Sequence, residues 1–253
     1  MKKQLLYILL FTTFLTSAQT QAFKKGEWLK YKISYSNFLS AGNATLEVKE
    51  ADAKKAFHIV GKGETTGVIS WFFKVRDTYQ SYFNKETMAP YRFDRKINEG
   101  GYTKNKRILF NQTNQIATVK DYKNKTEETF TTTENVQDML STLYFLRNQN
   151  ISEMKSGHQV ALTMFFDEKN YPFTLKFLGR EVIETKFGKV NAAKFRPVVQ
   201  SGRVFKENES LTVWVSDDEN KIPLRIKASL AVGSMLVDLD AYKGLANTFP
   251  ILF

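Results

Sequence analysis

The sequence of 253 residues contains no cysteine and only two histidines, His58 and His158. Without cysteine the chain forms no disulfide, carries no lipid on an N-terminal cysteine and offers no thiolate to a zinc ion. The two histidines fall in separate strand-like segments, and their spacing is not typical of a metal site. We therefore expect neither a metal nor another cofactor.

Motifs for catalysis are also missing. The chain has no Gly-x-Ser-x-Gly nucleophile turn, and the glycines at 61, 63 and 67 do not lie between a strand and a helix, as a phosphate-binding loop requires. The adjacent Asp217 and Asp218 would point to opposite faces of a strand, so a turn explains them better than shared acid–base chemistry. No catalytic residue is predicted.

Three further carboxylates, Glu27, Asp77 and Asp138, are not brought together by any sequence spacing. We expect them to pair with Arg76 or Arg147, or to stabilise the start of a helix.

The chain has little long apolar sequence, and the one such run lies at the N-terminus. Lys2 and Lys3 precede an apolar run from Leu5 to Leu15, and small residues precede Ala18 and Ala22. This pattern is typical of a secretory signal peptide, because the run is shorter than the roughly 20 apolar residues of a membrane-spanning helix. We expect cleavage after Ala18 or Ala22, with no transmembrane segment after it.

The remaining chain, 23–253, is long enough for a single β-rich domain, and no Pro-, Gly- or Ser-rich linker divides it. Removing residues 1–22 leaves 35 basic and 26 acidic residues, a net charge of +9. The lysines are scattered through alternating patterns, which is typical of solvated strand faces. Export and this alternation both argue against nucleic acid as a partner, and we expect a periplasmic or secreted protein.

Alternating apolar and polar residues recur along most of the chain, starting at Trp28–Tyr35, and turn residues separate the alternating segments. One segment, Thr133–Arg147, has apolar residues three and four apart instead, and predicts a helix with Thr133 as its N-cap. The predicted fold is mainly β: a large curved antiparallel sheet or half-open barrel with one central α-helix at about 133–148.

A dense apolar run, Val68–Val75, follows the three glycines. Two interpretations stay open: a buried strand or core plug, and a short lid segment at about 68–75 that covers a ligand cavity. The second interpretation makes Trp71, Phe72 and Phe73, together with Trp214, the predicted ligand-binding residues.

Two segments on opposite sides of the predicted helix resemble each other. Tyr82–Phe93 and Trp214–Ile226 both read as aromatic, apolar, polar turn, proline, apolar, arginine, apolar. Proline is permitted at the first position of a returning strand. We infer two similar hairpins in one continuous sheet, a hypothesis that fails if the hairpins lie in unrelated sheets.

Several short motifs, in order and spacing, resemble the domain of unknown function 3108 family of exported bacterial proteins over most of residues 24–245. The motifs are Gly26-Glu27-Trp28-Leu29-Lys30-Tyr31, Val75-Arg76-Asp77, Met88-Ala89-Pro90-Tyr91-Arg92-Phe93, Val136-Gln137-Asp138-Met139-Leu140-Ser141, Tyr144-Phe145-Leu146-Arg147, Val213-Trp214-Val215-Ser216-Asp217-Asp218 and Ile222-Pro223. The resemblance implies an exported, mainly β protein and carries no established reaction. In architecture alone, the chain is also similar to periplasmic lipoprotein carriers, whose curved sheet surrounds an apolar cavity.

The aromatic content is high, with 35 Phe, Tyr and Trp residues. These residues could line a cavity or fill a core. With the apolar run as a cover, we expect the protein to bind or carry an apolar, lipid-like ligand such as an acyl chain. The alternatives are a structural or assembly factor that contacts an envelope protein through a sheet edge, and an enzyme acting on an envelope polymer.

Overall fold

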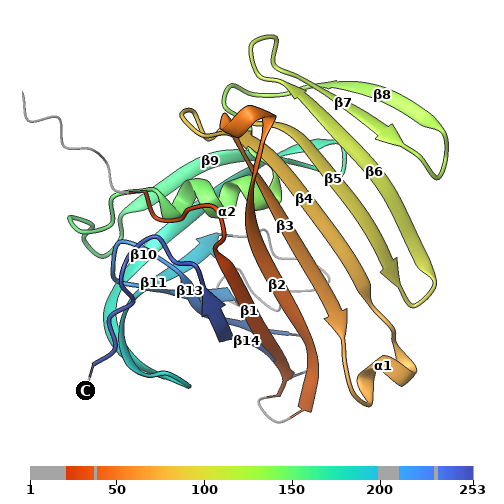
Figure 1. The fold of residues 1–253 in the computed structure, drawn as a ribbon. Helices are drawn as coiled ribbons and strands as arrows, with labels where there is room; N and C mark the ends of the chain where they lie inside the picture. The colour runs from red at the N-terminus through yellow and green to blue at the C-terminus, as the bar shows by residue number, and fades with distance from the viewer. Residues whose placement is uncertain (1–20, 37–38, 199–210, 231–232, 253) are drawn as a thin grey trace, which may run out of the picture.

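The computed structural model describes residues 21–36, 39–198, 211–230 and 233–252. The fold is one antiparallel sheet of 14 strands in the order β8-β7-β6-β5-β4-β3-β2-β1-β14-β13-β12-β11-β10-β9 (Figure 1). The strands are β1 (Trp28–Tyr35), β2 (Leu39–Ala51), β3 (Ala56–Thr65), β4 (Arg76–Asn84), β5 (Pro90–Glu99), β6 (Tyr102–Asn111), β7 (Ile116–Asp121), β8 (Thr126–Thr131), β9 (Gln159–Phe166), β10 (Lys169–Thr185), β11 (Gly188–Val198), β12 (Leu211–Ser216), β13 (Pro223–Ser229) and β14 (Ser234–Lys243). The helices are α1 (Ile69–Phe72), α2 (Met139–Arg147) and the 3-10 turn η1 (Asp52–Lys54). The predicted fold class is confirmed.

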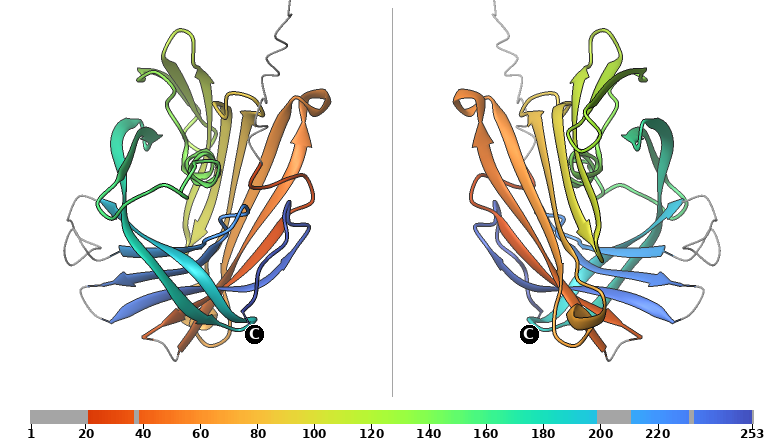
Figure 2. Two further views of the ribbon diagram at one scale, coloured as in Figure 1. Left: turned by 90° about the vertical axis from the view of Figure 1, so that its left-hand side faces the viewer. Right: turned by 90° about the vertical axis from the view of Figure 1, so that its right-hand side faces the viewer.

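The sheet is strongly curved, and its two edges face each other across α2 (Figure 2). Side chains join the two sides of the curved sheet: Arg95 of β5 and Lys106 of β6 reach the β9–β10 turn at Asp167 and Glu168, with N–O distances of 2.6 and 2.5 Å. Next to β9, Gln137 forms a parallel bridge to Met164, just before α2 begins. The sheet is thus a half-open barrel with the helix lying inside its curve.

The helix begins at Met139, later than the sequence predicted. Asp138 is its N-cap: Asp138 Oδ1 accepts hydrogen bonds from the backbone N–H of Leu140 and Ser141, both at 2.8 Å. Ser141 Oγ accepts a hydrogen bond from the Asp138 N–H in return. Thr133 is therefore not the N-cap. Gln137, just before Asp138, pairs with β9, so the helix cannot begin earlier, and the capping box stabilises its start at Met139.

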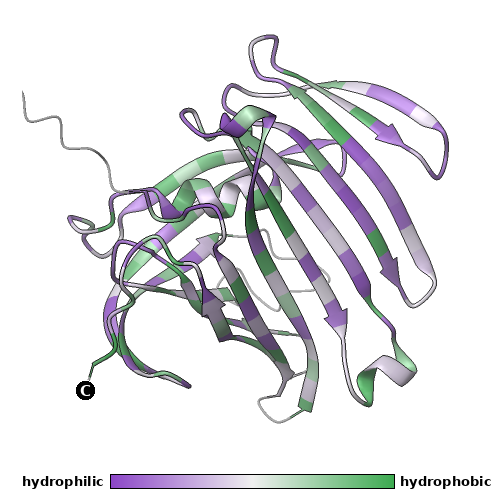
Figure 3. Ribbon diagram, in the orientation of Figure 1, coloured by the Kyte–Doolittle hydropathy of each residue, from purple (hydrophilic) through white to green (hydrophobic). Residues whose placement is uncertain are grey.

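One face of α2 packs on the half of the sheet made of β2–β7. Leu140 and Tyr144 are buried there with the rings of Phe23, Phe57 and Phe83, and the Tyr144 and Phe23 ring centroids lie 4.6 Å apart. Apolar residues recur on alternate positions of these strands (Figure 3). We call this aromatic core the filled half of the protein.

The two similar segments form the hairpins β4–β5 and β12–β13, and both lie in the one sheet, as the hypothesis required. Each hairpin has a register shift at the same place, before Phe83 in one and before Val215 in the other. Each has a left-handed residue two positions before its proline, with φ of 59° at Met88 and 47° at Lys221. The hairpins therefore share both features, although the second turn is one residue longer than the first.

Candidate functional site

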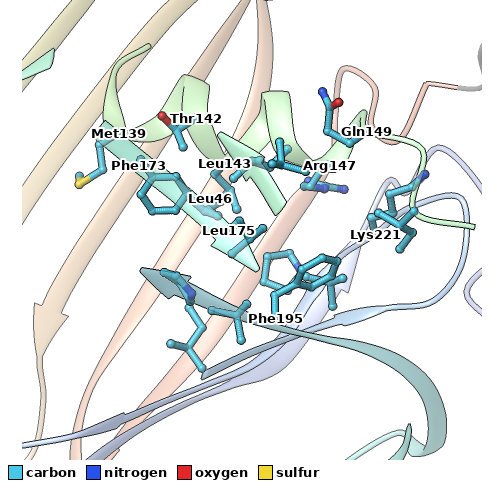
Figure 4. Close-up of a pocket in the computed structure, with 18 of the residues that line it drawn as sticks. Leu46, Met139, Thr142, Leu143, Arg147, Gln149, Phe173, Leu175, Phe195 and Lys221 are labelled. Carbon is cyan, nitrogen blue, oxygen red and sulfur yellow. The ribbon is translucent and has the colours of Figure 1, made fainter. Parts of the chain in front are cut away.

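A cavity of about 420 Å³ lies between α2 and the strands β1, β2 and β9–β14 (Figure 4). This volume falls within the roughly 300–1,000 Å³ of pockets that bind small molecules. Its lining is almost entirely apolar, and consists of Tyr31, Ala44, Leu46, Met139, Thr142, Leu143, Leu146, Arg147, Gln149, Ile151, Met154, Val160, Met164, Phe173, Leu175, Phe195, Pro197, Val213, Val215, Lys221, Pro223, Ile226 and Val237. We call this part of the molecule the hollow half.

The two faces of α2 separate the halves. Leu140 and Tyr144 point into the aromatic core, whereas Met139, Leu143 and Leu146 line the cavity. Because residues three and four apart share a helix face, the same short helix serves both sides.

The hairpin comparison explains why one half is hollow. Phe83 and Phe93 are buried in the filled half, and their equivalents in the second hairpin are Val215 and Ile226, which line the cavity. Two phenyl rings are thus replaced by smaller aliphatic side chains. Since protein interiors are otherwise close-packed, this loss of side-chain volume leaves space for a ligand.

At one end of the cavity the lining residues have polar or charged groups, although the surface that they turn to the cavity is apolar. Arg147, Gln149 and Lys221 lie together there, and Met139 lies at the opposite end (Figure 4). Arg147 forms a bidentate ion pair with the fully buried Glu27, with N–O distances of 2.6 and 2.8 Å. Its remaining hydrogen bonds go to the carbonyls of Ala22 and Asn220. The guanidinium is therefore already satisfied and is a structural part of this end.

Lys221 has a largely buried side chain, and its ammonium forms an ion pair with Glu219. Its side chain is 11% exposed, and the nearest recorded carboxylate oxygen, on Glu219, is 3.9 Å from Nζ. The backbone of Lys221 is fixed in the turn, since its N–H donates to Asp218 Oδ1 at 2.9 Å. The lysine is thus held at the cavity by the β12–β13 turn.

Two lining residues carry buried hydroxyls, Tyr31 and Thr142, for which the described residues provide no hydrogen-bond partner. Burial raises the pKa of Tyr31, and the nearby Arg147 and Glu27 charges act on it in opposite directions. The Tyr31 hydroxyl therefore stays protonated at neutral pH.

The predicted site residues Trp71, Phe72 and Phe73 lie elsewhere. They form α1 and its C-terminal end, and their exposed fractions are 82%, 84% and 51%. The run is therefore neither a buried strand nor a core plug, because it turns outward between β3 and β4. None of the three residues lines the cavity.

Trp214 also lies outside the lining, although Val213 and Val215 on either side of it belong there. Alternate residues of a strand point to opposite faces, so Trp214 is on the outer face of the sheet. There its Nε1–H donates to Glu181, and Lys194 lies 5.3 Å from its ring centroid.

The carboxylates act as the sequence predicted in two cases: Glu27 pairs with Arg147, and Asp138 caps α2. The histidines are apart, with His58 hydrogen-bonded to Gln80 at 2.9 Å and His158 exposed. Among the residues that the structure describes, no group of three or more His, Asp or Glu side chains could hold a metal ion.

Sequence reasoning did not identify the cavity, because its lining is spread over nine elements with no common spacing. A usable signal was present in the hairpin pair. Aligning the two segments at their prolines places Lys221 opposite Met88 and Ile226 opposite Phe93. Aligning them at Tyr82 and Trp214 places Val215 opposite Phe83, because the second turn is one residue longer. These are the positions at which the hollow half departs from the filled half.

Comparison with solved structures supports the fold. A protein from Brucella abortus, described as a beta-barrel-like protein of domain of unknown function DUF1849, is similar with a TM-score of 0.58. The two sequences are 10% identical, and the match covers 88% of this chain and 98% of that one. At this identity the likeness concerns the fold alone.

Two weaker structural matches have TM-scores of 0.33 and 0.35. The first is a candidate exported protein with a YmcC-like fold from Bacteroides fragilis, 9% identical, covering 87% of this chain and 97% of that one. The second is a candidate lipoprotein from Parabacteroides distasonis, 11% identical, covering 88% of this chain and 99% of that one. No curated protein matches the sequence.

No helix in the described part of the chain is long and apolar enough to cross a membrane. The family model described as "Protein of unknown function (DUF3108)" matches residues 30–240, which is most of the sequence. The chain therefore belongs to the DUF3108 family.

Proposed function

We propose that this exported protein binds a lipid-like ligand with a single hydrocarbon chain and carries it in the bacterial envelope. The apolar cavity of about 420 Å³ supports the proposal. At about 30 Å³ for each water-sized group, this space corresponds to roughly 14 such groups. An extended acyl chain fits a cavity that runs along one face of a helix.

The asymmetry between the halves argues that the space serves a ligand. In the similar hairpin β4–β5, Phe83 and Phe93 fill the corresponding space. Empty apolar space costs stability, by about 24 cal/mol for each Å³ in core truncations. A ligand that occupies this space would therefore stabilise the protein.

The alternative of assembly through a sheet edge has less support at the β8 edge. The edge strand β8 is six residues long and carries the exposed Glu127 and Glu128. Short, charged edge strands are features that discourage pairing with another chain.

The test is the double variant Val215→Phe with Ile226→Phe. It places in the hollow half the two phenyl rings that are present in the filled half. The probe is N-phenyl-1-naphthylamine, a neutral dye whose fluorescence rises in apolar surroundings. We expect the wild type to bind the dye and to release it when myristyl alcohol is added, and the filled variant to lose both responses. The control Lys227→Phe adds one ring to the same hairpin at an exposed position and should bind like the wild type.

A filled variant that folds and binds the dye as tightly as the wild type would overturn the proposal. Far-ultraviolet circular dichroism and the unfolding midpoint establish folding independently.

A further inference from the structure

The exposed aromatic turn at α1 is a second candidate for binding, apart from the cavity. In the part of the chain that the structure describes, Trp71 and Phe72 are the most exposed large apolar side chains, at 82% and 84%. Val68 and Phe73 on either side of them are also more than half exposed. The turn projects between the end of β3 and the start of β4 (Figure 1). We call these four residues the aromatic tip, and contiguous exposed apolar surface of this kind marks an interaction site.

Backbone contacts hold the aromatic tip in place. Thr65 Oγ1 donates to the Phe73 carbonyl at 3.0 Å and accepts from the Val75 N–H at 2.9 Å. In the β5–β6 turn, the Gly100 N–H donates to the Lys74 carbonyl at 2.9 Å. The Phe73 ring lies against Gly100, where any side chain would collide with it. The tip is thus fixed to two neighbouring hairpins, and Trp71 and Phe72 stay exposed to water.

Positive charge lies next to the aromatic tip. Lys74 follows the tip directly, Arg76 begins β4, and Lys62 and Lys96 both pair with Thr78 in the strand register. All four cations are exposed, and the described residues place no carboxylate oxygen within 4.0 Å of any of them. Arg76 and Lys96 also line a polar groove whose described lining contains no carboxylate. These cations are therefore available to an anionic partner.

The nearby carboxylates do not cancel this charge. Glu64 is exposed and lies opposite Arg76 in the β3–β4 register. Asp77 is buried and accepts a hydrogen bond from a backbone N–H of β5 at 3.0 Å. Glu99 is partly buried at the end of β5. The four exposed cations thus outnumber the exposed and partly buried carboxylates, which are Glu64 and Glu99.

We propose that the aromatic tip binds the anionic surface of a lipid bilayer. Trp71 and Phe72 enter the interfacial region, where aromatic rings are favoured, and the neighbouring cations contact lipid phosphates. A turn this short is small for a protein partner, because stable protein interfaces bury about 800 Å² on each side. The inference concerns the outer surface of the protein and does not depend on the cavity or its ligand.

The experiment is co-sedimentation with vesicles made of phosphatidylcholine alone or of an equimolar mixture with phosphatidylglycerol. We expect the wild type to bind the mixed vesicles, and to bind them less at high salt, because salt screens exposed charges. Trp71→Ser with Phe72→Ser should weaken this binding by about 10-fold, because two aromatic side chains no longer leave water. The control Tyr171→Ser with Val182→Ser removes two exposed apolar side chains from β10 and should bind like the wild type.

Two triple variants test the charge. The first replaces with glutamine the three lysines next to the tip, Lys62, Lys74 and Lys96, and should weaken binding to the mixed vesicles and reduce its salt dependence. The second removes the same charge at exposed positions elsewhere, Lys155, Lys169 and Lys227, and should bind more tightly than the first.

Far-ultraviolet circular dichroism and the unfolding midpoint establish that each variant is folded. The proposal is overturned if the wild type does not bind the mixed vesicles, or if Trp71→Ser with Phe72→Ser binds them as tightly as the wild type. Equal weakening in the two triple variants would overturn the role of the cations at the tip. None of these results concerns dye binding in the cavity, so the two proposals fail separately.

Discussion

Val215 in β12 occupies the position that Phe83 occupies in β4, with the same register shift in each hairpin. Phe83 is fully buried in an aromatic core, whereas Val215 lines the cavity. The sheet therefore contains two hairpins with the same register shift but with side chains of different size at this position. This difference determines which half is structural and which half is free to bind.

The buried pair of Arg147 and Glu27 joins the end of α2 to the start of β1. We expect Arg147→Met to lower the free energy of unfolding by about 3–5 kcal/mol, because it leaves a buried carboxylate without its counter-charge. Adding Glu27→Gln should recover part of this loss. Urea denaturation of the single and double variants measures both effects, and a loss below about 0.5 kcal/mol for Arg147→Met would place the pair outside the stabilising core.

Asp138 gives the stability a defined pH dependence. Burial raises its pKa to about 6 from the ordinary 3.8, although Ser81 Oγ and two helix N–H groups hydrogen-bond to the ionised form. The folded state therefore holds this proton more tightly than the unfolded state. This contribution to stability is fully present below pH 4, and it is lost as the pH rises to about 6.

The matched variant is Asp138→Asn, which keeps a good N-cap and removes the titration. The difference in unfolding free energy between wild type and Asp138→Asn should change by up to about 3 kcal/mol between pH 4 and pH 7, at about 1.4 kcal/mol for each pKa unit. A difference that is constant across this range would show that Asp138 titrates normally.

The two faces of α2 should respond differently to truncation. Leu140→Ala removes a side chain packed in the filled half, and we expect it to cost about 2–5 kcal/mol. Leu143→Ala should cost about 1–2 kcal/mol, because Leu143 is only partly buried and borders the cavity on one side. Thermal and urea unfolding measure the loss of stability in each variant. A larger loss for Leu143→Ala than for Leu140→Ala would contradict this prediction.

The exposed aromatic turn α1 should contribute little to stability. Trp71→Ser with Phe72→Ser replaces two side chains that are each more than 80% exposed. We expect the free energy of unfolding to change by no more than about 0.5 kcal/mol, as for other surface substitutions. A fall of several degrees in the unfolding midpoint would instead show that these rings stabilise the fold.

The contacts of Ala22 favour one of the two predicted positions for cleavage of the expected signal peptide. Its N–H donates to Asn148 Oδ1 at 3.1 Å, and its carbonyl accepts from Arg147 at 3.1 Å. Cleavage after Ala22 would remove both contacts, whereas cleavage after Ala18 would keep them. We expect the exported protein to begin at Gln19, and an intact mass that starts at Phe23 would contradict this.

The fold was largely predictable from the sequence, and the site was not. Strand alternation and one helical period identify the curved sheet and α2, because both patterns are local. The helix start was misplaced at Thr133, since the pairing of Gln137 with β9 is a long-range contact that no local pattern records. The parity of β12 was equally hidden: both faces of a curved sheet carry apolar residues, so Trp214 could not be assigned to the outer face.

The apolar run at Val68–Val75 is easily recognised in the sequence. Whether it turns toward the cavity or away from it depends on the strands that flank it. Thr65 Oγ1 donates to the Phe73 carbonyl at 3.0 Å, which fixes the turn at the end of the sheet and away from the cavity. The cavity itself results from what the second hairpin lacks relative to the first. A missing ring volume is visible only when the two segments are superimposed.

Native mass spectrometry of the protein isolated from its own cell envelope tests the central claim most directly. The account predicts a population heavier by the mass of one single-chain lipid, which is released by collisional activation. The Val215→Phe, Ile226→Phe variant, isolated in the same way, should lack this population. Wild-type protein that is entirely ligand-free, and that also fails to bind N-phenyl-1-naphthylamine in solution, would contradict the account.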